Sequence, residues 1–390
     1  MAEIHCRHFS GYKPCGKNEE CERASCRHYE SIGPRVLIVH LEALGAVLRS
    51  TSLLKAVRRR FAHAHVTWVT KAPAQALLQN LNDVDRVLTT SAEDLLKLSA
   101  LTFDVALVID KSLAATGVVE AAKSVREVRG FRADPVAGAI VPANPEALEL
   151  WRLGLSDQQK FFENQKTEQQ LVHEALALGP YRRDPYEVRL APAEMELAMA
   201  RRRQWAPGGG PIVGINTGCS PTLPAKKLSI EGHRRLILRW LKDPRFRDTT
   251  LVLLGGPEDS ERNEAIARDL PVIVSPTRAG LRDGLASVEA CDVVFSGDSL
   301  GLHMAIGLGK WVVAWFGPSC PQEIDLYDRG VKILTQAPCS PCWKRVCRQP
   351  VMCYDQVDFD QVLNALAQGC TWLTSSSKPL SQETSSSPFL

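Results

Sequence analysis

The feature that most constrains this chain is a repeated alternation of short β-branched runs with amphipathic stretches. From residue 35 on, strand-like runs such as RVLIVHL (35–41) and FDVALVID (103–110) alternate with helical patterns such as LRSTSLLKAVRRRF (48–61). Strands that alternate with helices predict a mostly parallel sheet covered by helices. We therefore expect an α/β protein.

The alternation begins a second time after a break. The segment APGGGP (206–211) interrupts the pattern, and PIVGINTG (211–218) opens a new series of strands and helices. With 390 residues, the chain is long enough for two domains. Two similar α/β halves that face each other predict a ligand cleft between them, at the carboxyl ends of their strands.

These patterns divide the chain into five segments. They are a cysteine-rich N-terminal segment (1–33), a first α/β domain (34–206), a second α/β domain (211–356) with a cysteine-rich loop (338–353), a C-terminal helix (357–373) and a tail (374–390). The tail is rich in serine, threonine and proline, so we expect it to be disordered.

Composition and charge argue against several classes of protein. The formal net charge of +3 is too small to indicate a nucleic-acid partner by itself. The stretch HCRHFSGYKPCGKNEEC (5–21) is polar where a signal peptide has an apolar core, and we find no apolar run of about 18 residues that could span a membrane. We therefore expect a cytoplasmic protein.

Most of the twelve cysteines fall into two groups of four. One group lies near each end of the chain: Cys6, Cys15, Cys21 and Cys26, and Cys339, Cys342, Cys347 and Cys353. In a reducing compartment, clustered cysteines favour metal ligation over disulfides. Four thiolates suit a structural Zn²⁺ or iron, and an iron–sulfur cluster stays open.

Three loops of the second half carry residue types that bind phosphates and sugars. Lys226 and Lys227, in NTGCSPTLPAKK (216–227), can offset phosphate charge, and LLGGPEDSE (253–261) combines two glycines with an acid. The loop SGDSLGLHMAIG (296–307) places polar residues at a helix N-terminus, which favours anions. Asp298 and Ser299 could equally be helix caps, and the lysine pair and Glu258 alone would more often be a solvated pair and an ordinary first-turn acid. Three such loops after three strands nevertheless favour a ligand site.

At this level of detail the sequence resembles glycosyltransferase family 9, the ADP-heptose:lipopolysaccharide heptosyltransferases. The matching pieces run in family order from about 35 to 355 and include EALGAVLRSTSLLKAVRRRF, FDVALVID, VGINTG…AKKLS, VLLGGPEDSER, GDSLGLHMAIGLGKWVVAWFGP and CSPCWKRVC. The resemblance implies a GT-B fold of two Rossmann-like domains, with the acceptor in the first and the nucleotide sugar in the second. It implies an inverting transfer that needs no metal, and a C-terminal helix that packs back across the first domain.

The resemblance also implies a donor site in the second domain. Lys226 would hold the diphosphate and assist its departure, Glu258 would bind the ribose, and Asp298, Ser299 and His303 would surround the phosphate–sugar region. The full expected donor set is Thr217, Gly218, Lys226, Lys227, Gly256, Glu258, Asp298, Ser299 and His303.

The chain departs from the family at the residue expected to be the general base. Many members read Gly-Asp where this sequence reads Gly45–Ala46, and an inverting transfer needs a base within reach of the acceptor hydroxyl. Glu42 is the nearest carboxylate in the sequence, and we hypothesise that it takes this role; the alternative is a loop acid beside a weak or inactive site. His40, Arg49 and Arg58 are the candidates for binding an anionic acceptor, against the alternative of ordinary packed or solvated residues.

The sequence thus predicts a glycosyltransferase that moves a sugar, a heptose by resemblance, from a nucleotide donor to a lipopolysaccharide-core, other glycan or lipid-linked acceptor. Contact with the inner membrane surface stays open, and no nucleic-acid partner is expected. Two other classes remain open. One is a sugar-nucleotide or glycan-binding protein that has lost the base, and the other is a metal- or iron–sulfur-dependent redox or sensor protein.

Overall fold

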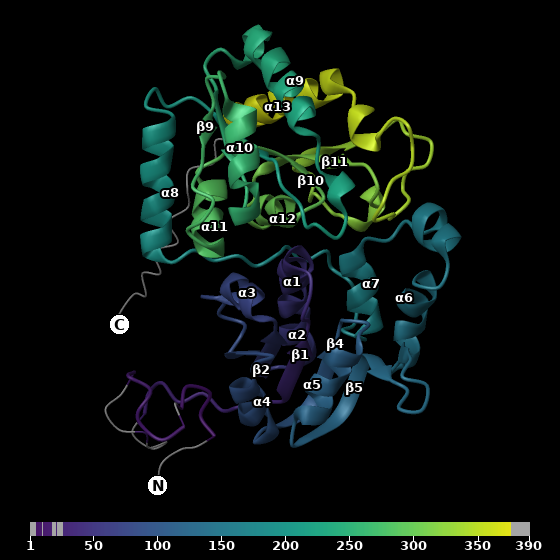
Figure 1. Ribbon diagram of the computed structural model, residues 1–390. Helices are drawn as coiled ribbons and strands as arrows, with labels where there is room; N and C mark the ends of the chain where they lie inside the picture. Colours follow the sequence, from purple (N-terminus) through teal and green to yellow (C-terminus); the bar gives the residue numbers. More distant parts are fainter. Residues whose placement is uncertain (1–4, 10, 18–20, 22–25, 376–390) are drawn as a thin grey trace.

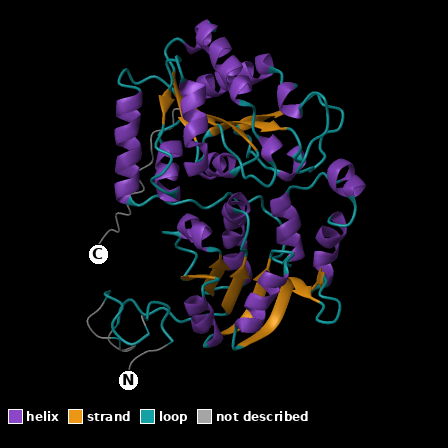
Figure 2. Ribbon diagram, viewed as in Figure 1, coloured by secondary structure: helices purple, strands orange, loops and turns teal. Residues whose placement is uncertain are grey.

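The computed structural model describes residues 5–9, 11–17, 21 and 26–375, so the tail expected at 374–390 lies, from residue 376 on, outside the described residues. Two domains follow each other along the chain and face each other in space (Figure 1). Each has a central sheet with helices packed around it (Figure 2). The expected α/β class with two Rossmann-like domains is confirmed.

The first sheet has the strand order β3-β2-β1-β4-β5-β6. Its strands are β1 (Arg35–Val39), β2 (His65–Thr70), β3 (Arg86–Thr89), β4 (Thr102–Val108), β5 (Ser124–Ala133) and β6 (Ile140–Pro142). All neighbours pair in parallel except β5 and β6, which are antiparallel. The order reverses between β1 and β4, and this switch point is where such sheets bind ligands, outside the carboxyl ends of the strands.

Seven α-helices and one π-helical turn accompany this sheet among the described residues. They are α1 (Leu44–Ser50), α2 (Leu54–Arg60), α3 (Ala72–Gln75), α4 (Ala92–Ser99), α5 (Leu113–Ala121), α6 (Leu148–Leu153), the π-helical turn η4 (Gln159–Glu163) and α7 (Glu168–Ala175). The core between sheet and helices is apolar, and Trp68, Leu37 and Ile38 are among its fully buried side chains.

The second sheet repeats the first, with the order β12-β11-β10-β7-β8-β9 and only parallel pairs. Its strands are β7 (Ile212–Asn216), β8 (Thr250–Leu254), β9 (Ile273–Val274), β10 (Val293–Gly297), β11 (Trp311–Phe316) and β12 (Gly330–Leu334). The strands β7, β10 and β11 are buried along their whole length, as apolar runs in a covered parallel sheet should be.

The helices of this half are α9 (Ile230–Lys242), α10 (Ser260–Ala267), α11 (Leu281–Glu289), α12 (Leu300–Gly307) and α13 (Phe359–Ser375). Ser229 caps α9, as its position before the apolar pattern suggests, because its hydroxyl accepts a hydrogen bond from the Gly232 N–H. The switch point of this sheet lies between β7 and β10.

Helix α8 (Pro192–Trp205) comes before the break at 206–211 but packs against α11 of the second sheet. Arg201 binds Asp283 at 2.7 Å, and Arg202 binds Asp292 at 2.8 Å. The chain therefore crosses between the domains earlier, in the segment 181–190, which has no regular secondary structure. A charged helix followed by Pro and Gly looks like a domain end in the sequence, but ion pairs that are distant in sequence decide where the helix packs.

The C-terminal helix α13 does not pack across the first domain, so that expectation is wrong. It lies against β10, β11 and β12 of the second sheet. Phe359, Val362 and Leu366 are buried in the core of that domain, because the helix presents its apolar side to the nearest uncovered sheet face.

Candidate active site

The switch point of the second sheet brings together three of the residues expected around the donor. Lys226 follows β7, and its Nζ lies 2.6 Å from Asp298 Oδ2, in the loop after β10. His303, in the first turns of α12, has its Nε2 3.8 Å from the other Asp298 oxygen. Gly297 permits this approach, since a Cβ there would lie 1.9 Å from the Lys226 carbonyl oxygen.

Electrostatics at this site follow from burial and from the neighbouring charges. Burial would raise the pKa of Asp298, but Lys226 and His303 bring it below its ordinary value. Burial, helped by the charge of Arg49, lowers the pKa of His303 to about 3. His303 is therefore neutral at physiological pH, and the only cation that touches Asp298 among the described residues is Lys226.

Ser299 precedes α12 and is tied to the end of β7. Asn216 Nδ2 donates to Ser299 Oγ at 2.9 Å and also to the Gly218 carbonyl oxygen at 3.0 Å. Thr217 is buried, and its hydroxyl donates to Asn263 Oδ1, so its side chain has a structural partner. These contacts fix the loop after β7 against the N-terminus of α12, where backbone N–H groups favour an anion.

The loop after β8 differs in detail from the expectation. Glu258, expected to bind ribose, is exposed, whereas its neighbour Asp259 is buried and accepts a hydrogen bond from the Gly256 N–H at 3.0 Å. Lys227 Nζ lies 3.9 Å from Asp259 Oδ1, and burial raises the pKa of that carboxyl. A Cβ at Gly218 would lie 1.9 Å from Asp259 Oδ2, so a larger residue there would displace that carboxylate.

The switch point of the first sheet contains a carboxylate that the sequence analysis did not select. Asp110 follows β4, accepts a hydrogen bond from the Leu41 N–H and has an oxygen 3.8 Å from His40 Nε2. Ser50 Oγ lies 2.7 Å from His40 Nδ1. Burial raises the pKa of Asp110 to about 6, and burial, with Arg49, lowers that of His40 to about 3. A mostly buried carboxylate thus lies beside a neutral histidine.

Glu42 lies in the same loop but in a different environment. Its side chain is 64% exposed and forms an ion pair with Lys71, which follows β2. Asp110 was missed because FDVALVID looks like an ordinary strand ending. Asp110 lies beside the His40 loop because β4 pairs with β1, and strand pairing cannot be read from a single sequence.

The two domains contact each other near Gly45–Ala46, the position where many family members have Gly-Asp. Helix α1 packs against α12, and a Cβ on Gly45 would lie 2.5 Å from the ring of His303. Arg49, one turn after Ala46, is buried and pairs with Glu168 at the start of α7. Ala46 therefore stands at the junction of the domains, and the charge nearest to it along the helix is already paired.

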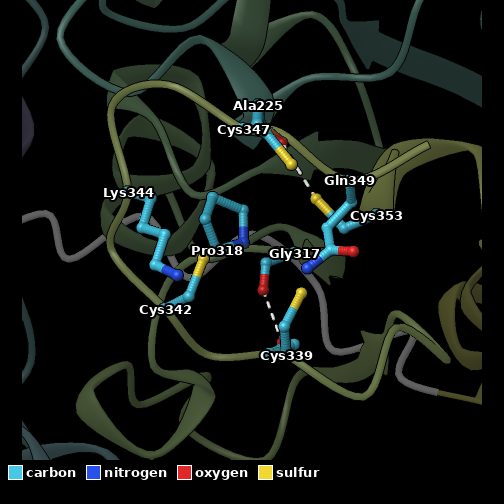
Figure 3. Close-up of a pocket in the computed structure, with 10 residues that line it drawn as sticks. Ala225, Gly317, Pro318, Cys339, Cys342, Lys344, Cys347, Gln349 and Cys353 are labelled. Atoms are coloured by element: carbon cyan, nitrogen blue, oxygen red, sulfur yellow. Dashed lines mark hydrogen bonds between the residues drawn. The ribbon is translucent and has the colours of Figure 1, made fainter. Parts of the chain in front are cut away.

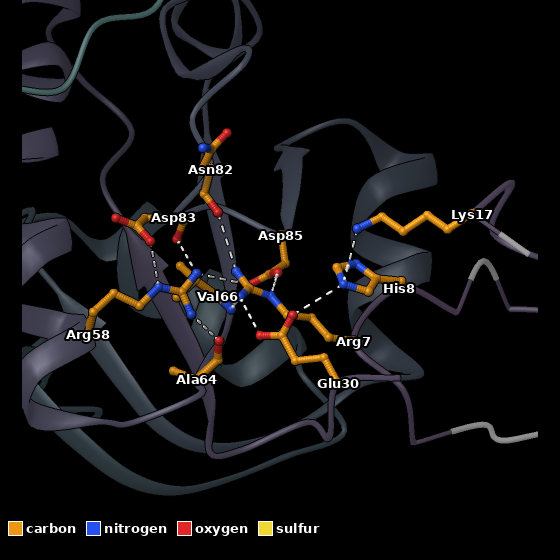
Figure 4. Close-up of polar contacts among 10 residues, drawn as sticks. All are labelled: Arg7, His8, Lys17, Glu30, Arg58, Ala64, Val66, Asn82, Asp83 and Asp85. Carbon is orange, nitrogen blue, oxygen red and sulfur yellow. Dashed lines mark hydrogen bonds and ion pairs between the residues drawn. The ribbon is translucent and has the colours of Figure 1, made fainter. Parts of the chain in front are cut away.

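The candidates for acceptor binding have partners within the protein. His40 is buried, and Arg49 is neutralised by Glu168. Arg58 binds Asp83 at 2.9 Å and Asp85 at 3.3 Å, beside the docked N-terminal segment (Figure 4). These contacts give Arg58 a structural role at the amino ends of β2 and β3. The switch point lies at the other end of the strands, the carboxyl end.

A second carboxylate at the domain junction was also missed. Glu323, in the loop after β11, is buried, and its Oε1 lies 3.8 Å from Lys160 Nζ of η4. Burial, reinforced by the charge of Glu168, raises the pKa of Glu323 to about 7. These residues come from two domains and from irregular segments, so sequence periodicity gives no sign of them.

The four C-terminal cysteines line one small pocket (Figure 3). Its wall also includes Ala225, which precedes Lys226, and Gly317 and Pro318, which follow β11. Burial, with the neighbouring thiols, raises the pKa of Cys353 to about 11. The donor set suits a soft metal, but among the described residues no three His, Cys, Asp or Glu side chains are close enough to hold one.

The N-terminal segment docks far from this pocket, on the first domain (Figure 1). Arg7 pairs with Asp85 and with Glu30, and His8 Nε2 lies 3.2 Å from Glu30 (Figure 4). Cys6, Cys15, Cys21 and Cys26 are described, free and half-buried, and they form no group that could hold a metal. The two cysteine groups do not meet in space. No helix of the described chain has the length and apolarity to cross a membrane.

The comparisons with known proteins point to one family. Residues 161–352 match the profile of glycosyltransferase family 9 (heptosyltransferase). No curated protein matches the chain in sequence. Among solved structures, a family 9 glycosyltransferase from Veillonella parvula aligns with a TM-score of 0.68 at 16% identity, over 87% of this chain and 98% of that one.

Two further structures share the fold. ADP-heptose lipopolysaccharide heptosyltransferase II of Escherichia coli aligns with a TM-score of 0.63 at 16% identity, over 87% of this chain and 99% of that one. The iron-containing dodecameric glycosyltransferase TibC of enterotoxigenic E. coli aligns with a TM-score of 0.51 at 12% identity, over 87% and 77%. The resemblance found in the sequence is confirmed: residues 161–352 match the family 9 profile, and these structures share the two-domain fold.

Proposed function

We propose that the protein transfers a sugar, with inversion, from a nucleotide-sugar donor to a glycan acceptor. The observation that carries this proposal is the cluster of Lys226, Asp298 and His303 at the N-terminus of α12, inside the region that matches the family profile. A paired lysine beside free helix N–H groups suits a diphosphate leaving group. The name of the E. coli structure, an ADP-heptose lipopolysaccharide heptosyltransferase, supports ADP-heptose as donor and a lipopolysaccharide-core glycan as acceptor. A lipid-linked acceptor and a cytoplasmic location are part of the proposal.

The second step of the proposal concerns the base. Glu42 remains the prediction from sequence, but Asp110 has the better environment, since it is largely buried and has its pKa raised to about 6. A general base works best with a pKa near the working pH. We therefore propose Asp110 as the group that takes the acceptor proton, with the Leu41 N–H and His40 fixing its orientation.

The experiment is ADP release by the full-length protein given ADP-heptose and a deacylated lipopolysaccharide core. Acceptor-dependent release that is lost in Asp110→Asn supports a transferase with this base. Tight donor binding with no release by any variant would instead support the non-catalytic sugar-nucleotide-binding class.

We also propose that Cys339, Cys342, Cys347 and Cys353 draw together around Zn²⁺ or iron when the metal binds, because all four line one pocket and TibC, which shares the fold, is iron-containing. A closed four-thiolate site has no open position, so the ion would order the loop and would not take part in transfer. Elemental analysis of the purified protein should find about one ion per chain. Cys342→Ser should lose it, and Cys370→Ser, a cysteine outside both groups, should keep it.

A further inference from the structure

We propose that Trp343, in the cysteine-rich loop, positions the Lys226 amine for the donor diphosphate. The inference rests on the proposed function, because it assumes that Lys226 binds that diphosphate. It assigns the cysteine-rich loop a part in donor binding through one aromatic ring, whether or not the loop holds a metal.

The geometry centres on the indole ring. Lys226 Nζ lies over the Trp343 ring, 4.7 Å from its centroid, while it also pairs with Asp298 at 2.6 Å. An ammonium over an indole face is attracted by the ring quadrupole, and tryptophan is the strongest partner of this kind. The amine is therefore held from two sides, by a carboxylate and by an aromatic face.

The two partners affect Lys226 differently. Asp298 neutralises the lysine charge, so a diphosphate must compete with it. The ring attracts the ammonium but carries no negative charge. It also does not use an ammonium N–H in a hydrogen bond to oxygen. Trp343 thus fixes the amine in place and leaves it free to donate to a phosphate oxygen.

Trp343 is itself firmly placed. The N–H groups of Cys342 and Trp343 both donate to the Pro318 carbonyl oxygen, at 3.1 and 2.9 Å. The indole Nε1–H donates to Cys320 Sγ at 3.3 Å, and the Trp343 backbone has a φ of 49°. A bulky residue in the left-handed region is strained, and it keeps that conformation only when its surroundings hold it there. The loop after β11 and the chain beside Cys342 supply those surroundings.

The same loop also touches the backbone that carries Lys226. Ala225 lines the pocket with the four cysteines, and Cys353 Sγ lies 4.0 Å from the Ala225 carbonyl oxygen. The lysine is therefore contacted by this loop through its side chain and through its preceding residue. A change in the packing of the loop would therefore shift both the Lys226 side chain and the backbone before it.

The ring receives a second cation from the other domain. Lys160 Nζ, in η4, lies 4.5 Å from the Trp343 centroid and 3.8 Å from Glu323. Gln322 Nε2 donates to the carbonyl oxygens of Lys160 and Phe161, at 3.2 and 3.3 Å. Trp343 thus joins a lysine of the first domain to the proposed phosphate-binding lysine of the second.

The test is a double-mutant cycle on ADP binding by the full-length protein, measured calorimetrically. Trp343→Ala should weaken ADP binding about 5- to 10-fold, and Trp343→Phe, which keeps an aromatic face, should stay within about 2-fold. When Lys226→Ala is already present, Trp343→Ala should have little further effect. Full additivity of the two changes, or an unchanged Kd in Trp343→Ala, would overturn the inference.

The control is Trp372→Ala in α13, which removes a half-buried tryptophan of the same domain that packs on Trp311, at the start of β11 and so at the opposite end of the sheet. It should leave the Kd for ADP unchanged. A thermal melt of each variant shows whether the fold is kept.

A second measurement needs no ligand: acetylation of Lys226 by acetic anhydride, followed by mass spectrometry. The rate at Lys226 should rise in Trp343→Ala and not in Trp372→Ala. If the wild-type protein does not bind ADP, the proposed donor fails, and the acetylation rates decide separately whether Trp343 holds the amine. Equal rates in wild type and Trp343→Ala would overturn that placement.

Discussion

The two domains share one strand order but place different chemistry at their switch points. In the second domain, the ends of β7 and β10 carry a lysine, an acid and a helix N-terminus, with Lys226 and Asp298 2.6 Å apart. In the first, the ends of β1 and β4 carry a buried acid and a neutral histidine, Asp110 and His40. The same scaffold thus places a cation and a helix N-terminus, which suit an anion, on one side, and a carboxylate with a raised pKa on the other.

The difference lies in what burial does to each acid. Asp298 is buried with a cation, so its pKa falls below the ordinary value and it stays charged. Asp110 is buried beside neutral His40, with Lys71 contributing only weakly, so its pKa rises to about 6. A carboxylate with a close cation holds a fixed charge, whereas one without such a partner can exchange a proton near neutral pH.

The variant Asp110→Asn is the strongest test of this difference between the two acids. If Asp110 takes the acceptor proton, turnover should fall by about 10²- to 10³-fold while the affinity for ADP stays unchanged. In the wild type, log kcat/KM should fall with decreasing pH below about 6, as Asp110 takes up its proton. Steady-state rates between pH 5 and 8 measure both effects. Wild-type turnover in Asp110→Asn would remove the base from this position.

Lys226→Ala tests the other side of the comparison. Loss of the cation at the diphosphate should lower kcat/KM by about 10²-fold and weaken ADP binding as well. It should also leave Asp298 buried without its cation, which raises the pKa of that carboxyl. Lys242→Ala, an exposed lysine at the end of α9, is the matched control and should leave both quantities unchanged. Equal losses in the two variants would show that Lys226 has no specific role.

Asp110→Asn should also stabilise the folded protein at alkaline pH. The folded pKa of about 6 lies above the ordinary 3.8, so the proton is bound more tightly in the folded state. The stabilising effect of that proton is complete below about pH 4 and is lost as the pH rises through 6. Above that, the buried charge costs about 1–3 kcal/mol, which asparagine removes.

Thermal melts at pH 5 and pH 8 measure this effect. The variant should gain more over the wild type at pH 8 than at pH 5. An equal change in the melting temperature at both pH values would mean that Asp110 does not titrate in this range. If Asp110 is a functional group that costs stability, its replacement should give a protein that is more stable but inactive.

The fold could be predicted well from the sequence because it depends on a pattern that repeats. A parallel strand such as β11 is apolar throughout, and Ser229 marks the start of α9. The packing of α8 and α13 could not be predicted, because it depends on partners far along the chain.

The candidate donor residues could be brought together from the sequence more readily than the buried carboxylates, for a related reason. Lys226, Asp298 and His303 each follow a strand of one sheet, so topology alone gathers them. Asp110 and Glu323 acquire their chemistry from burial and from neighbours on other elements, and a sequence does not display either. The distance from Trp343 to Lys226 is likewise set by tertiary packing.

The smallest expected effect is that of Glu42→Gln, and it decides between the two carboxylates of the first domain. The Glu42 side chain is 64% exposed and pairs with a Lys71 that is 47% exposed, and such pairs add only about 0–1 kcal/mol to stability. If Asp110 is the base, turnover in Glu42→Gln should stay within about 2-fold of the wild type, with the same acid limb in the pH profile. Loss of turnover in Glu42→Gln together with an active Asp110→Asn would return the base role to Glu42. It would then mean that the loop moves on acceptor binding, because the Glu42 side chain is exposed and paired with Lys71 in this structure.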